Sequence, residues 1–160
     1  MTIQVGDKVP SATLKYLSPE GPKDITTEEL FRGKKVALFA VPGAFTGTCH
    51  KMHVPSILQS ADAIKAKGVD TIAVTSVNDV FVMDAWKKAT AADNIEFLAD
   101  GNGEFAKALD LSFDGSGNGL GTRSKRYSML VEDGVVKKLN IEEAAGKVEV
   151  SGGDTLVKQL

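Results

Sequence analysis

The sequence predicts an α/β fold with a central mixed β-sheet flanked by helices. A continuous apolar run, Val36–Val41, is typical of a strand buried on both faces of a sheet. Strand-like and helix-like segments then alternate along the chain, which favours parallel strands joined by crossover helices. Near the C-terminus, Asp133-Gly134 separates two strand-like segments and predicts a hairpin, which adds antiparallel strands.

Size and composition favour one domain covering residues 1–160. The chain is 42% apolar and 25% charged, as is ordinary for a soluble globular protein. The net charge of −2 gives no electrostatic reason to expect nucleic acid or an anionic membrane as a partner. No apolar run is long enough to span a bilayer, and the first residues lack the pattern of a signal peptide. We therefore expect a cytoplasmic protein.

The first strand, Val36–Val41, follows a basic turn at Gly33-Lys34-Lys35. A helix that begins at Cys49 and stops at Gly68 is predicted next, and Pro55 is expected to kink it. The apolar residues at helical spacing are Val54, Ile57, Leu58, Ala61 and Ile64.

A second strand is predicted over Thr71–Val77. Asn78 or Asp79 can cap the helix that follows it to about Thr90. The residues expected on the inner face of this helix are Val82, Ala85, Trp86 and Ala89.

The remaining segments complete the alternation. Ile95–Ala99 is expected to be a short third strand, and Gly103–Leu109 a short helix. The segment Ser112–Gly121 is rich in Gly, Ser and Asn and is predicted to be a loop. Tyr127–Glu132 and Val135–Ile141 form the predicted hairpin.

Asp154 can cap a final helix that carries Leu156, Val157 and Leu160. The complete order of elements fits a thioredoxin-like α/β sandwich. In open sheets of this kind, functional sites gather where strands end and helices begin, and Cys49 lies at such a position.

Cys49 is the only cysteine, so the chain can form no internal disulfide and has no Cys/His metal framework. We therefore expect a reduced thiol, and neither a metal nor a cofactor. At the start of a helix, a thiolate meets free backbone N–H groups and the positive end of the helix dipole. Thr46 can bring a hydroxyl to the same pocket as donor or acceptor, and Pro42 can shield the sulfur from water. The alternative is a buried, inert thiol.

The stretch "PGAFTGTCHKMHVP" resembles the active-site motif of the peroxiredoxins, thiol peroxidases with a thioredoxin fold. It is most similar to the type II, or peroxiredoxin-5-like, subfamily. Three further segments, "KGVDTIAVTSVNDVFVMDAW", "FLADGNGEFAKALDL" and "RSKRYSMLVEDGVVKKLNIE", resemble type II segments in the same order. The likeness extends from about Gly6 to the C-terminus.

The resemblance implies a role for each matched residue. Cys49 corresponds to the peroxidatic cysteine, Thr46 to its hydroxyl partner and Pro42 to the shielding proline. Arg126 corresponds to the active-site arginine, whose guanidinium favours the thiolate and can hold the peroxide oxygens. The backbone N–H groups of Thr48 and Cys49 are expected to complete the substrate-binding site.

Several nearby residues have a plainer interpretation. Arg123 and Lys125 are expected to be solvated surface charges. His53 is expected to be a hydrogen-bonded structural histidine, and His50, which stands where the family commonly has serine, an exposed residue at the helix start. Gly47 stands where the family usually has proline or another small residue. A glycine there can loosen the loop, because it costs more backbone entropy to order.

Two further motifs are interpreted without chemistry. The glycine-rich run from Gly115 to Gly121 matches no phosphate-binding pattern and is expected to be a mobile surface loop. Met83, Met129 and Trp86 are expected to pack in the core.

A sulfenic acid on Cys49 must condense with another thiol to recover. The positions where some type II relatives carry a second cysteine hold Val74 and the cysteine-free segment "GKVEVSGG". The resemblance therefore implies a one-cysteine cycle that reduces hydrogen peroxide and alkyl hydroperoxides, with glutathione and glutaredoxin, or thioredoxin, as reductant. It also implies a homodimer.

Two other functions use the same cysteine. A redox sensor or relay would pass oxidation from Cys49 to a partner protein through a mixed disulfide. A cysteine hydrolase would need a histidine base with its own orienting group, and His50 is poorly placed for that role.

Overall fold

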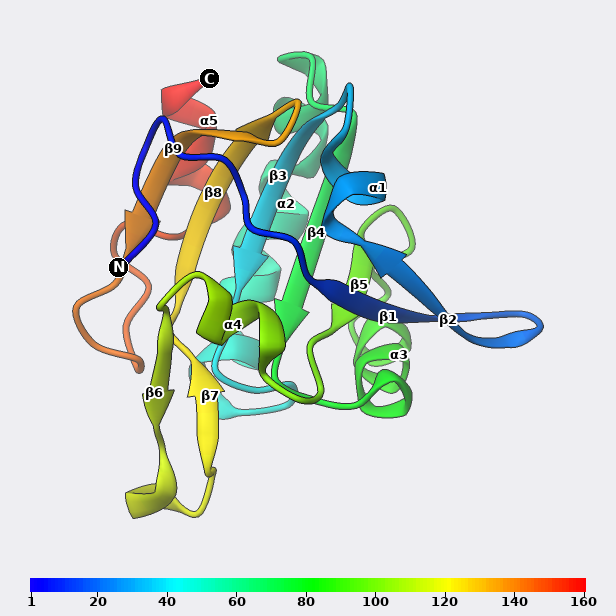
Figure 1. Ribbon diagram of the computed structural model, residues 1–160, viewed down its shortest axis with the longest axis vertical. Helices are drawn as coiled ribbons and strands as arrows, with labels where there is room; N and C mark the ends of the chain where they lie inside the picture. Colours follow the sequence, from blue (N-terminus) through cyan, green and yellow to red (C-terminus); the bar gives the residue numbers. More distant parts are fainter.

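The computed structural model describes residues 1–160 and has a seven-stranded sheet at its centre (Figure 1). The order across the sheet is β2-β1-β5-β4-β3-β8-β9. β3, β4 and β5 are parallel, and every other pairing in this sheet is antiparallel. The strands are β1 (Thr13–Ser18), β2 (Gly21–Thr26), β3 (Lys35–Ala40), β4 (Thr71–Ser76), β5 (Glu96–Ala99), β8 (Tyr127–Glu132) and β9 (Val135–Ile141). The predicted mixed sheet and the late hairpin are confirmed.

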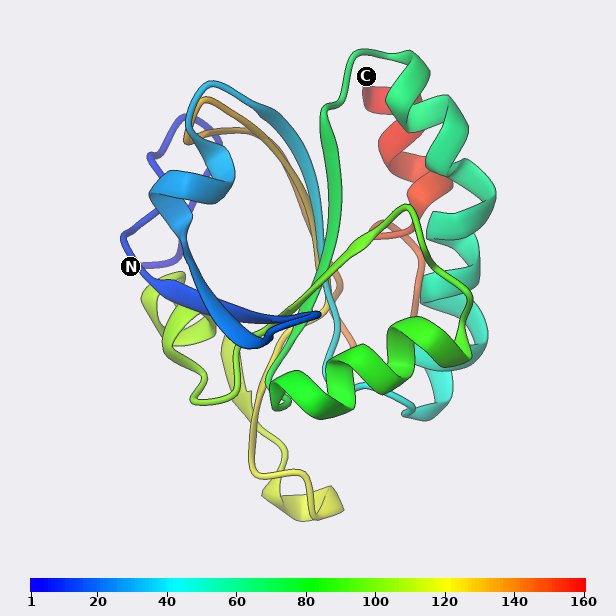
Figure 2. The same ribbon diagram turned by 90° about the vertical axis from the view of Figure 1, so that its right-hand side faces the viewer.

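Helices cover both faces of this sheet (Figure 2). The helices are α1 (Thr27–Phe31), α2 (Val54–Ala66), α3 (Val80–Ala89), α4 (Glu104–Ala108) and α5 (Gly153–Gln159). α2, α3 and α5 lie on one face, and α1 and α4 with the N-terminal segment lie on the other. A separate hydrophobic cluster fills each side, and Cys49 belongs to the cluster under α2, α3 and α5. The three-layer arrangement is thioredoxin-like, as predicted.

β3 is the central strand that the apolar run predicted. All of its residues after Lys35 are buried, because β4 and β8 flank it and helices cover both of its faces. The next predicted strand is also buried, as β4. Because β3 and β4 are parallel, the segments that follow Ala40 and Ser76 leave the sheet at the same edge.

Three N-terminal elements form from residues for which the sequence pattern predicted no structure. β1 and β2 are an antiparallel pair at the sheet edge, and α1 follows β2 directly. Their outward positions carry Lys15, Lys23 and Asp24, so an apolar alternation is hard to see. The side chain of Thr26 caps α1 in a reciprocal capping box with Glu29.

The helix after Cys49 differs from the prediction in its first turns. Residues Cys49–His53 are π-helical, and Val54 N donates to Cys49 O. Pro55 therefore lies in the first turn of α2, where a missing N–H is tolerated, and it does not interrupt that helix. A single π-helical turn of this kind is uncommon and is often found at functional sites.

The prediction for the inner face of α3 is partly wrong. Asp79 caps the helix through a bond from Val82 N, as predicted, and Trp86 is fully buried. Ala85 and Ala89, however, are exposed. The buried residues are Val80, Met83 and Trp86, a stripe at three-residue spacing that begins at the first residue of the helix.

Two predictions near the C-terminal half are also corrected. The segment predicted as a loop contains β6 (Ser112–Asp114) and a 3₁₀ turn (Ser116–Asn118), and β6 pairs with β7 (Thr122–Ser124) in a hairpin below the main sheet in Figure 1. The final helix is capped at Gly152, so Asp154 lies inside its first turn. An acidic residue there still favours the helix through the dipole.

Candidate active site

Pro42 and Thr46 lie in the loop that joins β3 to the Cys49 turn. Pro42, Gly43 and Ala44 are buried, and Ala44 N donates to Asn78 Oδ1 across 2.9 Å. Thr46 is half-buried, and its hydroxyl donates to Gly43 O at 2.7 Å. Since that proton is committed, the lone pairs of Thr46 Oγ1 remain as acceptors.

Gly43 is required by the close packing of this loop. A Cβ at this position would lie 2.8 Å from Thr46 Cγ2 and 3.0 Å from Arg123 Nη1. A Cβ at Gly47, in contrast, would meet no atom within 4 Å. The first glycine therefore fixes where the Thr46 hydroxyl lies, and nothing in the structure requires the second to be glycine.

Cys49 lies in the first turns of the helix and is 1% exposed. The first helical hydrogen bond runs from His50 N to Thr46 O, at 2.9 Å. The N–H groups of Thr48 and Cys49 therefore precede the hydrogen-bonded part of the helix, at the positive end of its dipole.

Arg126 lies 77 positions after Cys49 in the chain, one residue before β8, and is only 2% exposed. Each nitrogen of its guanidinium has one partner. Nη2 donates to Cys49 Sγ at 3.0 Å, Nη1 donates to His53 Nδ1 at 2.9 Å, and Nε donates to Ala145 O at 3.0 Å. A guanidinium has five N–H donors, so two remain.

No carboxylate pairs with this buried cation. The ion pairs of the protein all involve lysines, and none includes Arg126. A buried charge without a counter-ion is costly. Among the three hydrogen-bond partners of the guanidinium, Cys49 is the one whose side chain can carry a negative charge.

His53 is fully buried, and its ring is perpendicular to that of Phe39, at a centroid distance of 5.9 Å and an interplanar angle of 89°. Since arginine only donates, Nδ1 must accept from Arg126, and Nε2 carries the proton that binds Ser151 O at 2.8 Å. Burial and the Arg126 charge lower the pKa of His53 to about 4. His53 is hydrogen-bonded as predicted, and one of its two partners is the site arginine.

His50 is not the exposed residue that was expected. It is half-buried, and Nδ1 accepts a 2.9 Å hydrogen bond from Trp86 Nε1. The ring of Phe45 stacks on it at 5.7 Å with an interplanar angle of 27°. This contact ties the Cys49 turn to α3, and it involves the predicted core residue Trp86.

The two basic neighbours of Arg126 differ from each other. Lys125 is exposed, as predicted. Arg123 is half-buried, which corrects the expectation of a solvated charge: Nε donates to Leu120 O at 2.9 Å, and Nη1 reaches Pro42 O at 3.3 Å. The β6–β7 hairpin thus places a second arginine against the active-site loop.

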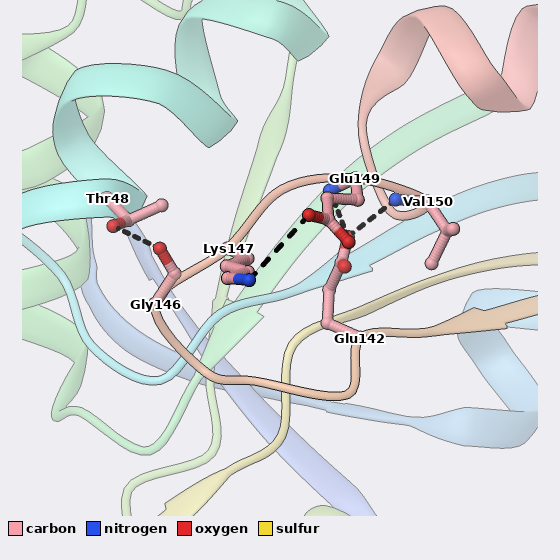
Figure 3. Close-up of polar contacts among 6 residues, drawn as sticks. All are labelled: Thr48, Glu142, Gly146, Lys147, Glu149 and Val150. Atoms are coloured by element: carbon pink, nitrogen blue, oxygen red, sulfur yellow. Dashed lines mark hydrogen bonds and ion pairs between the residues drawn. The ribbon is translucent and has the colours of Figure 1, made fainter.

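A further set of contacts has no signal in the sequence. Residues 142–151, which we call the strap, connect β9 to α5 and pass beside the Cys49 turn (Figure 3). Thr48 Oγ1 donates to Gly146 O of the strap at 2.9 Å. Glu142 lies at the start of the strap, and its carboxylate accepts hydrogen bonds from Glu149 N and Val150 N near the end of the strap, both at 2.8 Å (Figure 3).

No three side chains of His, Cys, Asp or Glu are grouped so that they could hold a metal ion. No helix is both long enough and apolar enough to cross a membrane. The polar side chain that contacts the Cys49 sulfur is Arg126, and His53 is bonded to that arginine.

Comparison with known proteins shows the family. A Redoxin family model matches residues 4–157. The chloroplastic Peroxiredoxin-2E of Arabidopsis thaliana is 48% identical over 160 residues, which cover 97% of this chain and 68% of the relative. Hybrid peroxiredoxin hyPrx5 of Haemophilus influenzae is 45% identical over 162 residues, which cover 100% of this chain and 67% of the relative. The chain is a type II peroxiredoxin.

Solved structures agree with this assignment. The crystal structure of reduced Prx3 from Vibrio vulnificus in complex with H₂O₂ has a TM-score of 0.94 at 50% identity, with 99% of each chain covered. Peroxiredoxins are thiol peroxidases, so this peroxiredoxin reduces peroxides with electrons from thiols. Its single cysteine fits a one-cysteine cycle.

Proposed function

We propose that Cys49 is the peroxidatic nucleophile and that Arg126, Thr46 and Pro42 form its site. The observation that supports this most directly is the 3.0 Å contact between Arg126 Nη2 and Cys49 Sγ. It pairs a buried cation with a buried sulfur at a helix start.

The reaction follows from these contacts. The thiolate attacks the peroxide oxygen that carries hydrogen, an S–O bond forms and the O–O bond breaks. Cys49 becomes a sulfenic acid, and the other oxygen leaves as an anion that takes a proton to give water or an alcohol. Charge moves from sulfur to the leaving oxygen, so the two remaining N–H donors of Arg126 and the N–H groups of Thr48 and Cys49 stabilise the transition state. Thr46 Oγ1 accepts from the peroxide O–H.

Recovery requires a thiol from outside the chain. An external thiol condenses with the sulfenic acid to release water and form a mixed disulfide, and a second thiol releases Cys49 in its reduced form. We propose glutathione with glutaredoxin, or thioredoxin, as the source. Because Cys49 is 1% exposed, a small thiol reaches the sulfur more readily than a folded partner does. This weighs against the sensor or relay function and, of the two reductants, favours glutathione as the thiol that attacks first.

Two further properties are proposed with the function. Phe45 and Phe81 are exposed near the Cys49 turn and α3, which supports a homodimer that covers them. The relatives include chloroplastic, mitochondrial and bacterial proteins. We place this chain, as a single peroxiredoxin domain, in the cytoplasm, because its lone thiol needs a reducing compartment. Sedimentation and cell fractionation test these two points.

Rapid mixing with hydrogen peroxide tests the nucleophile. Wild-type protein should lose one thiol per chain much faster than free cysteine does, and Cys49→Ser should be inert. A wild-type rate equal to that of a free thiol would contradict the proposal. Turnover with glutathione and glutaredoxin, set against thioredoxin, then identifies the reductant.

A further inference from the structure

The strap supplies acceptors that hold the active-site side chains. Ala145 O accepts from Arg126 Nε at 3.0 Å, and Ser151 O binds His53 Nε2 at 2.8 Å. His53 in turn accepts from Arg126 Nη1. Two of the three guanidinium nitrogens of Arg126 are therefore oriented by the strap, one directly and one through His53.

The strap itself contains no helix or strand. Between Glu142 and Val150 most of its residues are exposed, and it lacks the ladder hydrogen bonds that hold β9. An irregular segment of this kind needs another source of order if its carbonyls are to direct a guanidinium.

Glu142 is that source. Its Oε2 atom accepts four hydrogen bonds, from Glu149 N, Val150 N and Ser151 N at 2.8 Å and from Ser151 Oγ at 2.7 Å. Glu142 N also donates to Arg126 O at 3.0 Å, and the residue is 7% exposed. One carboxylate therefore closes the strap into a loop whose base is bonded to the arginine.

The ionised form of Glu142 is the one that fits four donors. Burial opposes this form, but the bonds from the Ser151 hydroxyl and the three N–H groups outweigh it and hold the pKa of Glu142 below its ordinary value. A neutral side chain of the same shape accepts these donors less strongly.

We propose that Glu142 is a positioning residue for the reaction of Cys49: by closing the strap, it directs Ala145 O and, through Ser151 O, His53, so that Arg126 Nη2 points at the sulfur. This rests on the proposed function of Cys49 and Arg126. Glu142 touches neither the sulfur nor the peroxide and acts only through the arginine. Errors of about 1 Å in such alignment cost on the order of 100-fold in rate.

The experiment compares Glu142→Gln and Glu142→Ala with a matched control, Asp100→Asn. Asp100 is also a buried carboxylate that accepts two backbone N–H groups, from Phe105 and Ala106, but it belongs to the α4 side of the sheet. Circular dichroism verifies folding. The readouts are the rate constant of thiol loss with hydrogen peroxide and the pH profile of Cys49 alkylation by iodoacetamide.

We expect Glu142→Gln to slow thiol loss about tenfold and Glu142→Ala more, while the alkylation profile moves to higher pH, because a displaced guanidinium no longer stabilises the thiolate. Asp100→Asn should lower stability and leave both readouts unchanged. Folded Glu142 variants with wild-type rate and profile would overturn the proposal. So would an equal effect of Asp100→Asn, which would show a merely structural role.

A double mutant tests whether Glu142 acts through Arg126. In an Arg126→Ala background, adding Glu142→Gln should change the rate less than about twofold, because the interaction is already lost. The same fold-change in both backgrounds would overturn the proposal. Slow peroxide reaction of the wild type would instead contradict the proposed function, while the alkylation profile would still report on Glu142.

Discussion

Arg126 Nη2 lies 3.0 Å from Cys49 Sγ, although 77 positions separate the two residues in the chain. The contact exists because β8 pairs with β3 in the sheet: Tyr127 lies opposite Ala40, so the residue before β8 comes to the edge where the active-site loop leaves β3. The register of β8 against β3 thus places the buried Arg126 cation beside the thiol of Cys49, which follows β3 in the chain.

Acid should weaken this protein through His53. Its pKa is about 4 in the folded state, against an ordinary 6.5, so between these values the unfolded chain binds a proton that the folded protein does not. The contribution of His53 to the free energy of unfolding should therefore be fully present above pH 6.5. It should be lost as the pH falls toward 4, by at most about 3 kcal/mol. Chemical denaturation at several pH values measures this.

His53→Gln is the matched control, because an amide can still accept from Arg126 and donate to Ser151 O without titrating. Its stability should be flat between pH 6.5 and 5. Glu142, whose folded pKa is depressed, adds a loss that begins only below about 4.5 and remains in both proteins. Equal slopes for wild type and variant between pH 6.5 and 5 would contradict the lowered pKa of His53.

Two glycines in one loop should respond oppositely to alanine. Gly43→Ala places a methyl 2.8 Å from Thr46 Cγ2, so we expect a loss of about 1–3 kcal/mol and slower thiol oxidation as the hydroxyl moves. Gly47→Ala meets no neighbour and lies in a helical turn, so we expect a gain of about 0.4–1 kcal/mol. Urea denaturation of both variants gives the answer. A similar change in both would argue against close packing around Gly43.

His50→Ala should affect the only tryptophan directly. Without the Nδ1 acceptor, the buried Trp86 N–H loses its partner, which costs about 1–3 kcal/mol. Because the chain has one tryptophan, its fluorescence reports on this site alone. We expect a changed emission spectrum and reduced stability. Unchanged emission would mean that the contact contributes nothing in solution.

The central sheet and the nucleophile were predictable because their signals are local. Val36–Val41 is a continuous apolar run, and Asp133-Gly134 adopts the positive φ values that its turn requires, at 48° and 82°. Cys49 stands at a strand-to-helix junction that periodicity reveals. The polar edge pair of β1 and β2 was missed, because an edge strand needs little apolar alternation.

The unpredicted part of the site depends on distance in space. His50 and Trp86 are 36 positions apart, and the bond from Arg126 to His53 spans 73. Neither pair shows a spacing that sequence periodicity could detect. The role of Glu142 also has no signal in the sequence, because its four hydrogen bonds form only after the strap has folded back toward Glu142.

The rate of Cys49 oxidation in Arg126 variants tests the central claim most directly. Arg126→Lys keeps a positive charge but loses the planar donors that bind His53 and Ala145, and Arg126→Ala loses both. For folded protein mixed rapidly with hydrogen peroxide, we predict a rate constant about 100-fold or more lower for Arg126→Ala, and an intermediate value for Arg126→Lys. A near-wild-type rate in folded Arg126→Ala would contradict the account.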